Sequence, residues 1–405
     1  MSPSIQIEKE LKRGAQLSII NLVDFLIEHA YETQASDIHI DLSEKQIRVR
    51  FRIDGVLHDA HVFPKDMHNQ IITRIKVLCG LRTDEHHAAQ DGRFRYSSVS
   101  SPVSIDIRVS MAPTYYGENA VLRLLVDKEE KYTLESLGFS PADREKIIKA
   151  VHKPHGMILS TGPTGSGKTT TLYTLIKMVS TKEVSIITIE DPIEYSVEDV
   201  EQIQVNPRSG LTFANGLRSI LRQDPNIIMV GEIRDAETAS IAVNTALTGH
   251  LLLSTLHTND AATTLPRLLD LGAEPYLVAS TVNLAIGQRL VRRICEQCKI
   301  KKKVSAVERD TLKNLLPEID EKNIKFMCGA GCESCAGTGY RGRISVNEVL
   351  AVDNEIRDAI LRKTSASELR RVALGQGMTS MLQDGMDKVK RGITTVEELL
   401  RVLHE

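Results

Sequence analysis

The spacing of apolar and polar residues changes along the chain, and each spacing predicts a different element. Within residues 17–33, apolar side chains recur at steps of three and four, which predicts an amphipathic helix. Within residues 47–57, arginines alternate with apolar residues, which predicts a strand with cations on one face, and Asp54-Gly55 predicts a hairpin turn. Strand-like runs at 104–112 and 119–126 complete an expected α+β module.

The pattern changes after a charged stretch at residues 127–146, in which Ser140-Pro141 predicts the start of a helix. Short apolar runs then alternate with helix-like segments as far as residue 287. These runs are residues 157–161, 184–190, 226–232 and 250–256. Buried parallel strands joined by crossover helices explain this alternation, so the expected fold class is α/β.

Composition restricts the class of protein further. The chain has 405 residues, of which 41% are hydrophobic and 26% charged, as is typical of a soluble protein of about two to three domains. A net charge of −2, the absence of Trp and only 4% aromatic residues argue against a nucleic-acid-binding protein. The N-terminal sequence has no apolar targeting segment and no apolar run is long enough to span a membrane, so we expect a cytosolic protein.

The motif GPTGSGKT at residues 162–169 follows a predicted strand and precedes a predicted helix. Its glycines let the loop curl so that backbone N–H groups and the helix N-terminus face a polyphosphate. Lys168 would then reach the β- and γ-phosphates, and the Thr169 hydroxyl would bind Mg²⁺. The expected nucleotide-binding residues are Gly162, Pro163, Thr164, Gly165, Ser166, Gly167, Lys168, Thr169 and Thr170.

Acidic residues follow two of the predicted strands. They are Glu190, Asp191, Glu194, Glu232 and Asp235. Because the carboxyl ends of parallel strands face one crevice, we expect these acids near Mg²⁺ or the attacking water. Helix capping is the alternative for Asp235 and Glu237.

Two histidines flank the predicted strand at 250–256. His257 follows its carboxyl end, where the side chain would contact the γ-phosphate or the attacking water. A structural role is an equal alternative for both His250 and His257.

Five of the six cysteines fall between residues 295 and 335. Two C-x-x-C pairs, Cys295 with Cys298 and Cys332 with Cys335, have the spacing of a tetrahedral, structural Zn²⁺ site. A redox pair is a weaker alternative, as is Cys328 in place of Cys332. The basic run at residues 289–303 fits anionic lipid, nucleic acid or a solvated face equally well.

The ordered phrases GPTGSGKT, TIEDPIEY, LRQDPNIIMVGEIRD and TGHLLLSTLHTND resemble the secretion ATPase superfamily, the hexameric motors of type II secretion and type IV pilus assembly. The phrases ASDIHID, VRFRIDGVL, QDGR and DIRVS are similar to the N-terminal domain of the same family. The resemblance covers nearly the whole chain from about Ser18. It implies a RecA-like P-loop ATPase core with an N-terminal α+β (PAS-like) domain and an inserted tetracysteine zinc subdomain.

The resemblance also implies roles for individual residues. In TIEDPIEY, Glu194 is the expected catalytic acid, with Glu190 as the alternative. In IIMVGEIRD, Glu232 would associate with Mg²⁺, and Gly231 occupies the position where the family usually has aspartate. His257 belongs to the family's histidine box. The N-terminal arginines that match those presented to nucleotide are Arg93, Arg108 and Arg123, for which a solvated sheet face is the alternative.

The expected organisation follows from these motifs. It comprises an N-terminal α+β domain (1–127), a linker (128–140), a RecA-like ATPase core (141–287), a zinc-binding subdomain (288–343) and a C-terminal helical region (344–405). Two departures from the family pattern, Ala89 in place of Pro after His86-His87 and Asn226 in place of Asp, are expected to affect only local turns.

The resemblance implies a cytoplasmic ring of six subunits, peripheral at the inner membrane, that uses ATP, Mg²⁺ and Zn²⁺. Its expected partners are an inner-membrane platform protein and an associated cytoplasmic docking protein. A further N-terminal docking domain is common in such motors; we expect this chain to lack it and to dock differently. The alternatives are a DNA-processing P-loop translocase and an ATP-binding regulatory scaffold.

Overall fold

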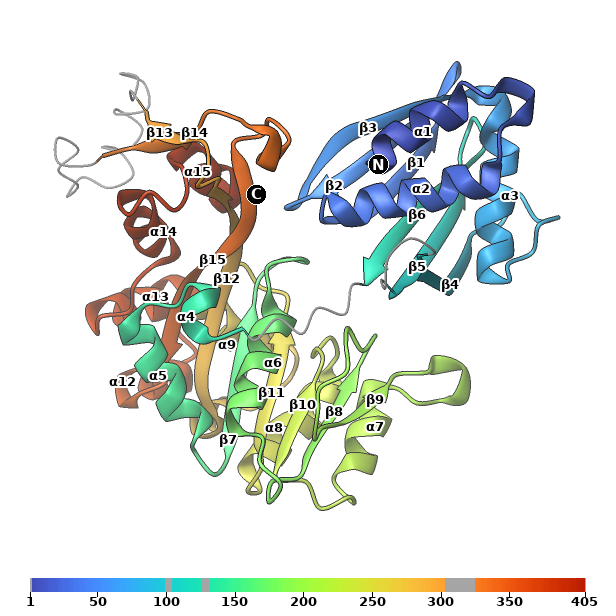
Figure 1. Cartoon of the computed structure of the whole chain (residues 1–405). Coiled ribbons are helices and arrows are strands. Elements are labelled where there is room, and N and C mark those ends of the chain that lie inside the picture. Colours follow the sequence, from blue (N-terminus) through green and yellow to red (C-terminus); the bar gives the residue numbers. More distant parts are fainter. Residues whose placement is uncertain (1, 99–103, 126–131, 303–324, 405) are drawn as a thin grey trace. The chain divides into compact units, whose positions relative to one another are not determined.

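The computed structural model describes residues 2–98, 104–125, 132–302 and 325–404. The chain forms two compact units, Met1–Glu130 and Lys131–Glu405 (Figure 1). Each unit has its own sheet and its own hydrophobic core. None of the helices in the described ranges combines the length and apolar character that a membrane span requires.

The N-terminal unit is a six-stranded antiparallel sheet with α1 and α2 lying across it (Figure 1). Its helices are α1 (Pro3–Leu11), α2 (Ile19–Glu32) and α3 (His68–Cys79). Its strands are β1 (Ala35–Leu42), β2 (Gln46–Ile53), β3 (Val56–Pro64), β4 (Gln90–Ser97), β5 (Ser104–Pro113) and β6 (Glu118–Leu125). The order across the sheet is β3-β2-β1-β6-β5-β4.

Alternating side chains give this sheet one apolar and one polar face. In β5, Ile105, Ile107 and Val109 are buried while the residues between them are more exposed. Asp54 and Gly55 have φ values of 49° and 86°, the left-handed conformation that a tight hairpin requires. The predicted turn between β2 and β3 is therefore confirmed.

The second unit contains a seven-stranded sheet and a separate two-stranded sheet. The strands of the large sheet are β7 (Gly156–Thr161), β8 (Ile186–Glu190), β9 (Glu201–Gln204), β10 (Ile227–Val230), β11 (Leu251–Leu256), β12 (Val282–Ile294) and β15 (Tyr340–Ala351). Their order is β15-β12-β7-β11-β10-β8-β9, and every neighbouring pair is parallel except β12 with β15. The small sheet pairs β13 (Lys299–Lys301) with β14 (Met327–Gly329).

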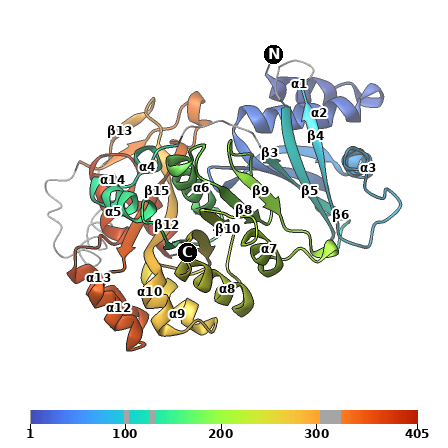
Figure 2. The same cartoon turned by 90° about the horizontal axis from the view of Figure 1, so that it is seen from below.

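Helices cover both faces of the large sheet, which can be followed in Figures 1 and 2. On one face lie α4 (Leu134–Leu137), α5 (Pro141–Val151) and α6 (Lys168–Val179). On the other face lie α7 (Phe213–Ile220), α8 (Ala236–Leu247), α9 (Ala261–Asp270), α10 (Pro275–Thr281), α12 (Asn354–Leu361) and α13 (Ala366–Gly375). The strands are buried on both sides, which confirms the prediction of a parallel α/β core.

The observed elements cross several of the boundaries expected from the sequence. The expected linker comprises residues 128–140. Residues 128–131 lie outside the described ranges, and residues 132–140 contain the helix α4. Leu134 and Phe139 are buried in the core, so two apolar residues anchor this charged segment to the second unit. Strands β12 and β15 carry the large sheet past residue 287 and past residue 344, where separate regions were expected to begin.

The C-terminal end of the chain packs beside the far halves of β12 and β15. The last helices are α14 (Met381–Lys390) and α15 (Val396–His404). Their apolar residues form a small core with Val291 of β12 and Val346 of β15. The cysteine-bearing segment between these strands is therefore an insertion between two paired strands, and its residues 303–324 lie outside the described ranges.

Candidate functional site

The GPTGSGKT loop joins the end of β7 to the start of α6, in the strand-loop-helix context predicted for it. Gly165 and Gly167 have φ values of 78° and 93°, a conformation that glycine adopts at little cost. Lys168 Nζ donates to the carbonyl oxygens of Gly162 and Pro163 at 2.8 and 3.0 Å. The ammonium group therefore lies against the curled backbone of the loop.

The geometry of this loop fits a phosphate group. Ser166 Oγ is buried and has no hydrogen-bond partner in the described part of the chain. A Cβ atom at Gly162 would lie 2.6 Å from that hydroxyl and 2.4 Å from the carbonyl oxygen of Gln288, so only glycine fits there. Since Thr169 lies in the first turn of α6, its hydroxyl fits the Mg²⁺ that accompanies a nucleotide.

A carboxylate and a histidine meet at the carboxyl ends of two neighbouring parallel strands. Glu232 follows β10 and His257 follows β11. His257 Nε2 lies 3.0 Å from Glu232 Oε2, and Arg234 also pairs with the same carboxylate. Glu232 is buried whereas the His257 side chain is half exposed. His250 lies at the other end of β11, where Nδ1 is 3.3 Å from the carbonyl oxygen of Thr245.

Glu190, the last residue of β8, and Glu194, four residues further along the chain, lie in different surroundings. Glu190 is 2% exposed and accepts hydrogen bonds from Tyr173 Oη, from Thr188 Oγ1 at 2.6 Å and from Gln202 Nε2 at 3.1 Å. Burial raises the pKa of Tyr173, and its hydrogen bond to Glu190 raises it further. Glu194 is exposed. Glu190 is thus enclosed by three protein donors, while Glu194 faces solvent.

Other acids at this edge have structural partners. Asp235 caps α8 by accepting a hydrogen bond from the Thr238 N–H at 2.8 Å, which supports the capping alternative for this residue. Glu237 pairs with Arg218 at 2.8 Å, and Asp191 is exposed. A Cβ at Gly231 would lie 3.3 Å from the backbone at the end of β8. The close approach of β8 favours glycine at this position, where the resemblance led us to expect aspartate.

Sequence reasoning missed two residues of β12 that lie beside the phosphate loop, Gln288 and Arg289. Burial lowers the pKa of Lys168 to about 8. The negative charge of Glu232 opposes this decrease and the positive charge of Arg289 adds to it, so both side chains lie near the Lys168 ammonium group. Arg289 is itself buried, and burial lowers its pKa. One feature of the sequence could have identified them: two adjacent polar residues interrupt the apolar run NLAIGQRLV.

The three arginines selected in the N-terminal unit lie side by side. Arg93 on β4 pairs in register with Arg108 on β5, which pairs with Arg123 on β6. Directly opposed residues project on the same face, so these cations form a row across the sheet. The next position in the row is Asp37, which accepts a hydrogen bond from Arg123 Nε at 3.0 Å. A row of like charges favours an anionic ligand.

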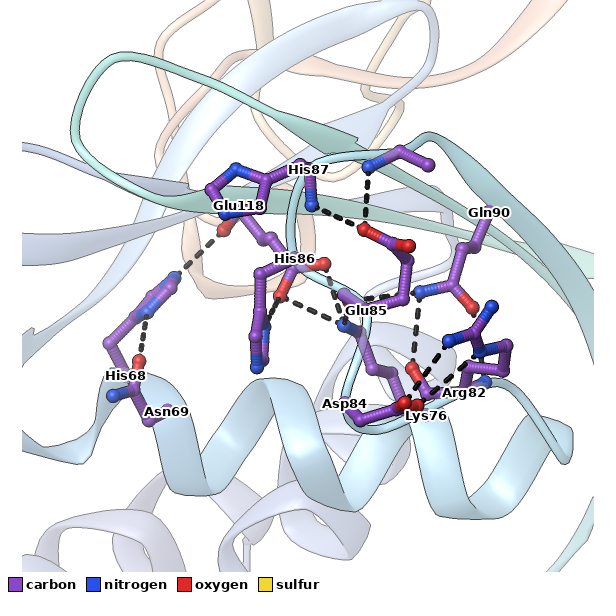
Figure 3. A network of polar contacts seen from close by, with 11 residues as sticks. His68, Asn69, Lys76, Arg82, Asp84, Glu85, His86, His87, Gln90 and Glu118 are labelled. Carbon is purple, nitrogen blue, oxygen red and sulfur yellow. Dashed lines mark hydrogen bonds and ion pairs between the residues drawn. The ribbon is translucent and has the colours of Figure 1, made fainter.

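Hydrogen bonds fix the loop that contains His86, His87 and Ala89 (Figure 3). The buried Lys76 ammonium lies 2.7 Å from Glu118 Oε1, and His86 Nδ1 lies 2.7 Å from Glu118 Oε2. Burial opposes ionisation of Glu118, but the hydrogen bonds from Lys76 and His86 outweigh it and lower its pKa. Glu85 Oε1 accepts the N–H groups of His87 and Ala88. Side chains thus define the turn where the family pattern has proline.

The thiols of Cys295, Cys298, Cys332 and Cys335 converge on one point, with all four sulfur atoms within 4.8 Å of one another. The Cys295–Cys332 and Cys298–Cys335 sulfur separations are 3.8 Å, and Cys332–Cys335 is 3.7 Å. Four sulfurs placed about 2.3 Å from a tetrahedral Zn²⁺ must be separated by about 3.8 Å. The geometry therefore fits zinc, and among the described residues this cluster does not include Cys328.

Glutamates neutralise much of the basic run beside the cysteines. Lys299 lies 3.3 Å from Glu296, Lys302 pairs with Glu397, and Lys303 lies outside the described residues. Arg292 lies 2.8 Å from Glu398, and its guanidinium is 4.2 Å from the centre of the Tyr340 ring. Burial opposes ionisation of Glu398, but hydrogen bonds from Arg401 and Arg292 lower its pKa to about 2. These contacts tie the cysteine end to α15 and leave no uniformly basic face along the described run.

The fold and the loop together define a class of protein. A doubly covered parallel sheet, a phosphate loop at the head of α6, and polar groups at adjacent strand ends are the features of a P-loop ATPase with a RecA-like core. A family model described as Type II/IV secretion system protein matches residues 13–401. The chain therefore belongs to this family.

Relatives agree with this assignment. The chain is 46% identical over 392 residues to the type IV pilus assembly ATPase PilB of Thermus thermophilus, covering 96% of this chain and 43% of the relative. It is 44% identical over 394 residues to the type II secretion system protein E of Xanthomonas campestris, covering 97% of this chain and 68% of the relative. The chain thus spans less than half of the first protein and about two thirds of the second.

Solved structures also share this fold. The pilus retraction motor PilT with bound ADP has a TM-score of 0.62 and 26% identity, with 94% of this chain and 96% of that chain covered. The Legionella pneumophila ATPase DotB has a TM-score of 0.67 and 24% identity, with 94% of each chain covered. The expected α/β class with a RecA-like core is confirmed.

Proposed function

We propose that this chain is the ATP-hydrolysing part of a six-subunit ring that powers type II protein secretion or type IV pilus assembly. The observation that carries the proposal is the meeting of the phosphate loop, the Glu232–His257 pair and the exposed Glu194 segment at the carboxyl ends of adjacent parallel strands. The names of the related pilus and type II secretion proteins support the process.

The phosphate loop binds and orients ATP in this proposal. Backbone N–H groups of residues 162–170 and the Lys168 ammonium hold the β- and γ-phosphates, and Ser166 supplies a hydroxyl. Thr169 and Glu232 would hold Mg²⁺, which neutralises charge on the phosphates. Glu194 orients a water molecule for attack on the γ-phosphoryl group, while Glu190 remains in its buried network.

Roles are also proposed for His257 and for the arginines of the N-terminal unit. The Glu232 carboxylate fixes the imidazole of His257, which then faces the γ-phosphate or the attacking water. Arg93, Arg108 and Arg123 contribute cations that neutralise the developing charge of the transition state. Movement of the N-terminal unit against the ATPase unit during turnover would convert hydrolysis into mechanical work.

Arg108→Ala is expected to reduce ATP turnover by about 10- to 100-fold, because the row then loses its central cation. Turnover is measured on assembled protein at saturating Mg²⁺-ATP. Arg48→Ala is the matched control, since Arg48 lies on the same sheet but pairs with Asp59 at 2.6 Å outside the row. Full activity of the Arg108→Ala protein would show that the three arginines form a solvated face of the sheet and take no part in turnover.

The cysteine cluster has a structural role in the proposal, because four protein sulfurs leave zinc no open coordination position. The ring would lie on the cytoplasmic side of the inner membrane, with a membrane-embedded platform protein and a cytoplasmic docking protein as partners. The DNA-processing alternative relied on Lys301 to Lys303 as a basic handle; Lys302 pairs with Glu397, and Lys303 lies outside the described residues, so the described contacts favour the motor over this alternative.

Deletion of the gene tests the proposed process. We expect loss of either exoprotein secretion or surface pili, restored by the wild-type gene and not by the Lys168→Ala gene at equal protein level. The phenotype that is lost identifies which of the two systems the motor serves. A deletion strain that retains both functions, in cells that have no second copy, would contradict the proposal.

A further inference from the structure

A buried amide on β12 contacts both sides of the phosphate loop. Gln288 is 1% exposed. Its Oε1 accepts a hydrogen bond from Ser160 Oγ at 2.9 Å, and its Nε2 donates to Thr171 Oγ1 at 2.9 Å. Ser160 lies on β7 directly before the loop, and Thr171 lies on α6 directly after it.

The third contact of Gln288 fixes it to the rest of the sheet. Its Nε2 also lies 3.3 Å from Asn347 Oδ1 on β15. The Asn347 N–H donates to Asp384 Oδ2 on α14 at 2.7 Å, and Lys388 pairs with that carboxylate at 2.5 Å. All of these residues are buried, so the amide is held in one place by a polar chain that water does not reach.

The main chain at the same position also touches the loop. The carbonyl oxygen of Gln288 would be 2.4 Å from a Cβ at Gly162, which shows how closely β12 approaches the first glycine of the motif. The side chain and backbone of one residue therefore contact the strand before the loop, the loop itself and the helix after it.

We propose that Gln288 is a positioning residue that sets the distance between β7 and α6 and thereby the shape of the phosphate loop. This inference rests on the proposed binding of ATP phosphates by residues 162–170. A phosphate cradle works only if its N–H groups point at fixed positions, and a displacement of about 1 Å costs on the order of 100-fold in rate. The two short hydrogen bonds of the amide oppose such a displacement.

The test is Gln288→Leu, which keeps the volume of the side chain approximately and removes its hydrogen bonds. We expect the KM for ATP to rise about 10-fold or more, with a smaller decrease in kcat, because the loop contacts the phosphates before and during reaction. Stabilisation of the protein by ADP in thermal unfolding should fall in parallel, which gives a readout independent of turnover.

The matched control is Asn283→Leu, which removes a buried amide at the other end of the same strand. Asn283 Nδ2 donates to the carbonyl oxygen of His155, which directly precedes β7 at the end of the strand away from the loop. This variant is expected to lower the unfolding temperature to a similar extent without changing the KM for ATP. An equal change of KM in the Gln288→Leu and Asn283→Leu proteins would show that Gln288 contributes only to general packing, and would overturn the inference.

Thr171 provides a second test that does not depend on the folding of Gln288→Leu. Thr171→Val has the same shape but no hydroxyl, and we expect it to raise the KM about as much, whereas Thr171→Ser should restore it. Unchanged KM in Thr171→Val and Gln288→Leu contradicts the inference. If Lys168→Ala also keeps full turnover, the proposed site fails instead, so the two failures are distinguishable.

Discussion

Lys168→Ala is expected to reduce ATP turnover at least about 100-fold with little change in the fold. The Lys168 ammonium is buried and donates to the carbonyl oxygens of Gly162 and Pro163; in the proposed function it holds the β- and γ-phosphates. Alanine leaves the loop backbone but removes the charge that stabilises the transferred phosphoryl group. Phosphate release from purified protein measures the effect, with circular dichroism as the check on folding.

The control for this variant is Lys149→Ala on α5. Lys149 is an exposed lysine that pairs with Glu145 at 2.6 Å, so its removal changes the net charge equally without touching the loop. Wild-type turnover is expected for this control. Persistent ATPase activity of the Lys168→Ala protein would contradict the assignment of residues 162–170 as the nucleotide site.

Cys332→Ser is expected to abolish zinc binding and to lower the unfolding temperature by at least about 5 °C. The effect should be large because the four thiolates close an insertion between β12 and β15, and one missing ligand leaves three sulfurs close together without their metal. Elemental analysis of the wild-type protein should give about one zinc per chain.

Cys328→Ser is the matched control for the metal site. Cys328 lies on β14 within the same insertion, but its thiol is not among the four that converge. We expect wild-type zinc content and stability for this variant. A fully folded wild-type protein without metal would overturn the zinc assignment, and loss of zinc from the Cys328→Ser protein would show that the ligand set is different.

Local motifs made the phosphate loop and the cysteine cluster predictable. Each depends on residues close together in sequence whose chemistry is explicit, such as Lys168 after its glycines or Cys332 three positions before Cys335. The buried strands were predictable for a similar reason, because a strand covered on both faces is apolar throughout.

Buried polar residues explain most of what the sequence did not reveal. Strand β15 contains Asn347 and Glu348. Considered alone, each of these polar residues would suggest an exposed segment or a helix and not a buried strand. In the structure, the Asn347 N–H donates to Asp384, and Glu348 Oε1 accepts the N–H of Ala261 at 2.7 Å. These partners are distant in the chain, so hydrophobic patterning could not identify them. The role of Gln288 could not be predicted for the same reason, because its partners Ser160 and Thr171 are also distant in the chain.

The arginine row shows the same limit in the N-terminal unit. The resemblance selected Arg93, Arg108 and Arg123, but their alignment in a row depends on which strands are neighbours and on the register between them. Similarly, the contacts of Glu190 with Tyr173 and Gln202 join residues that are distant in the chain, so the sequence could not reveal them; they support the proposal that Glu194 is the catalytic acid.

The pairing of β13 with β14 has a consequence for how this family of chains can vary in length. The segment that joins them, residues 302–326, starts and ends at adjacent hydrogen-bonded strands beside the converging cysteines. Because the paired strands hold the two ends of the connection, a change in its length that leaves Phe326 in place is expected to leave the large sheet unaffected, which makes the connection a suitable position for a fluorescent or affinity tag.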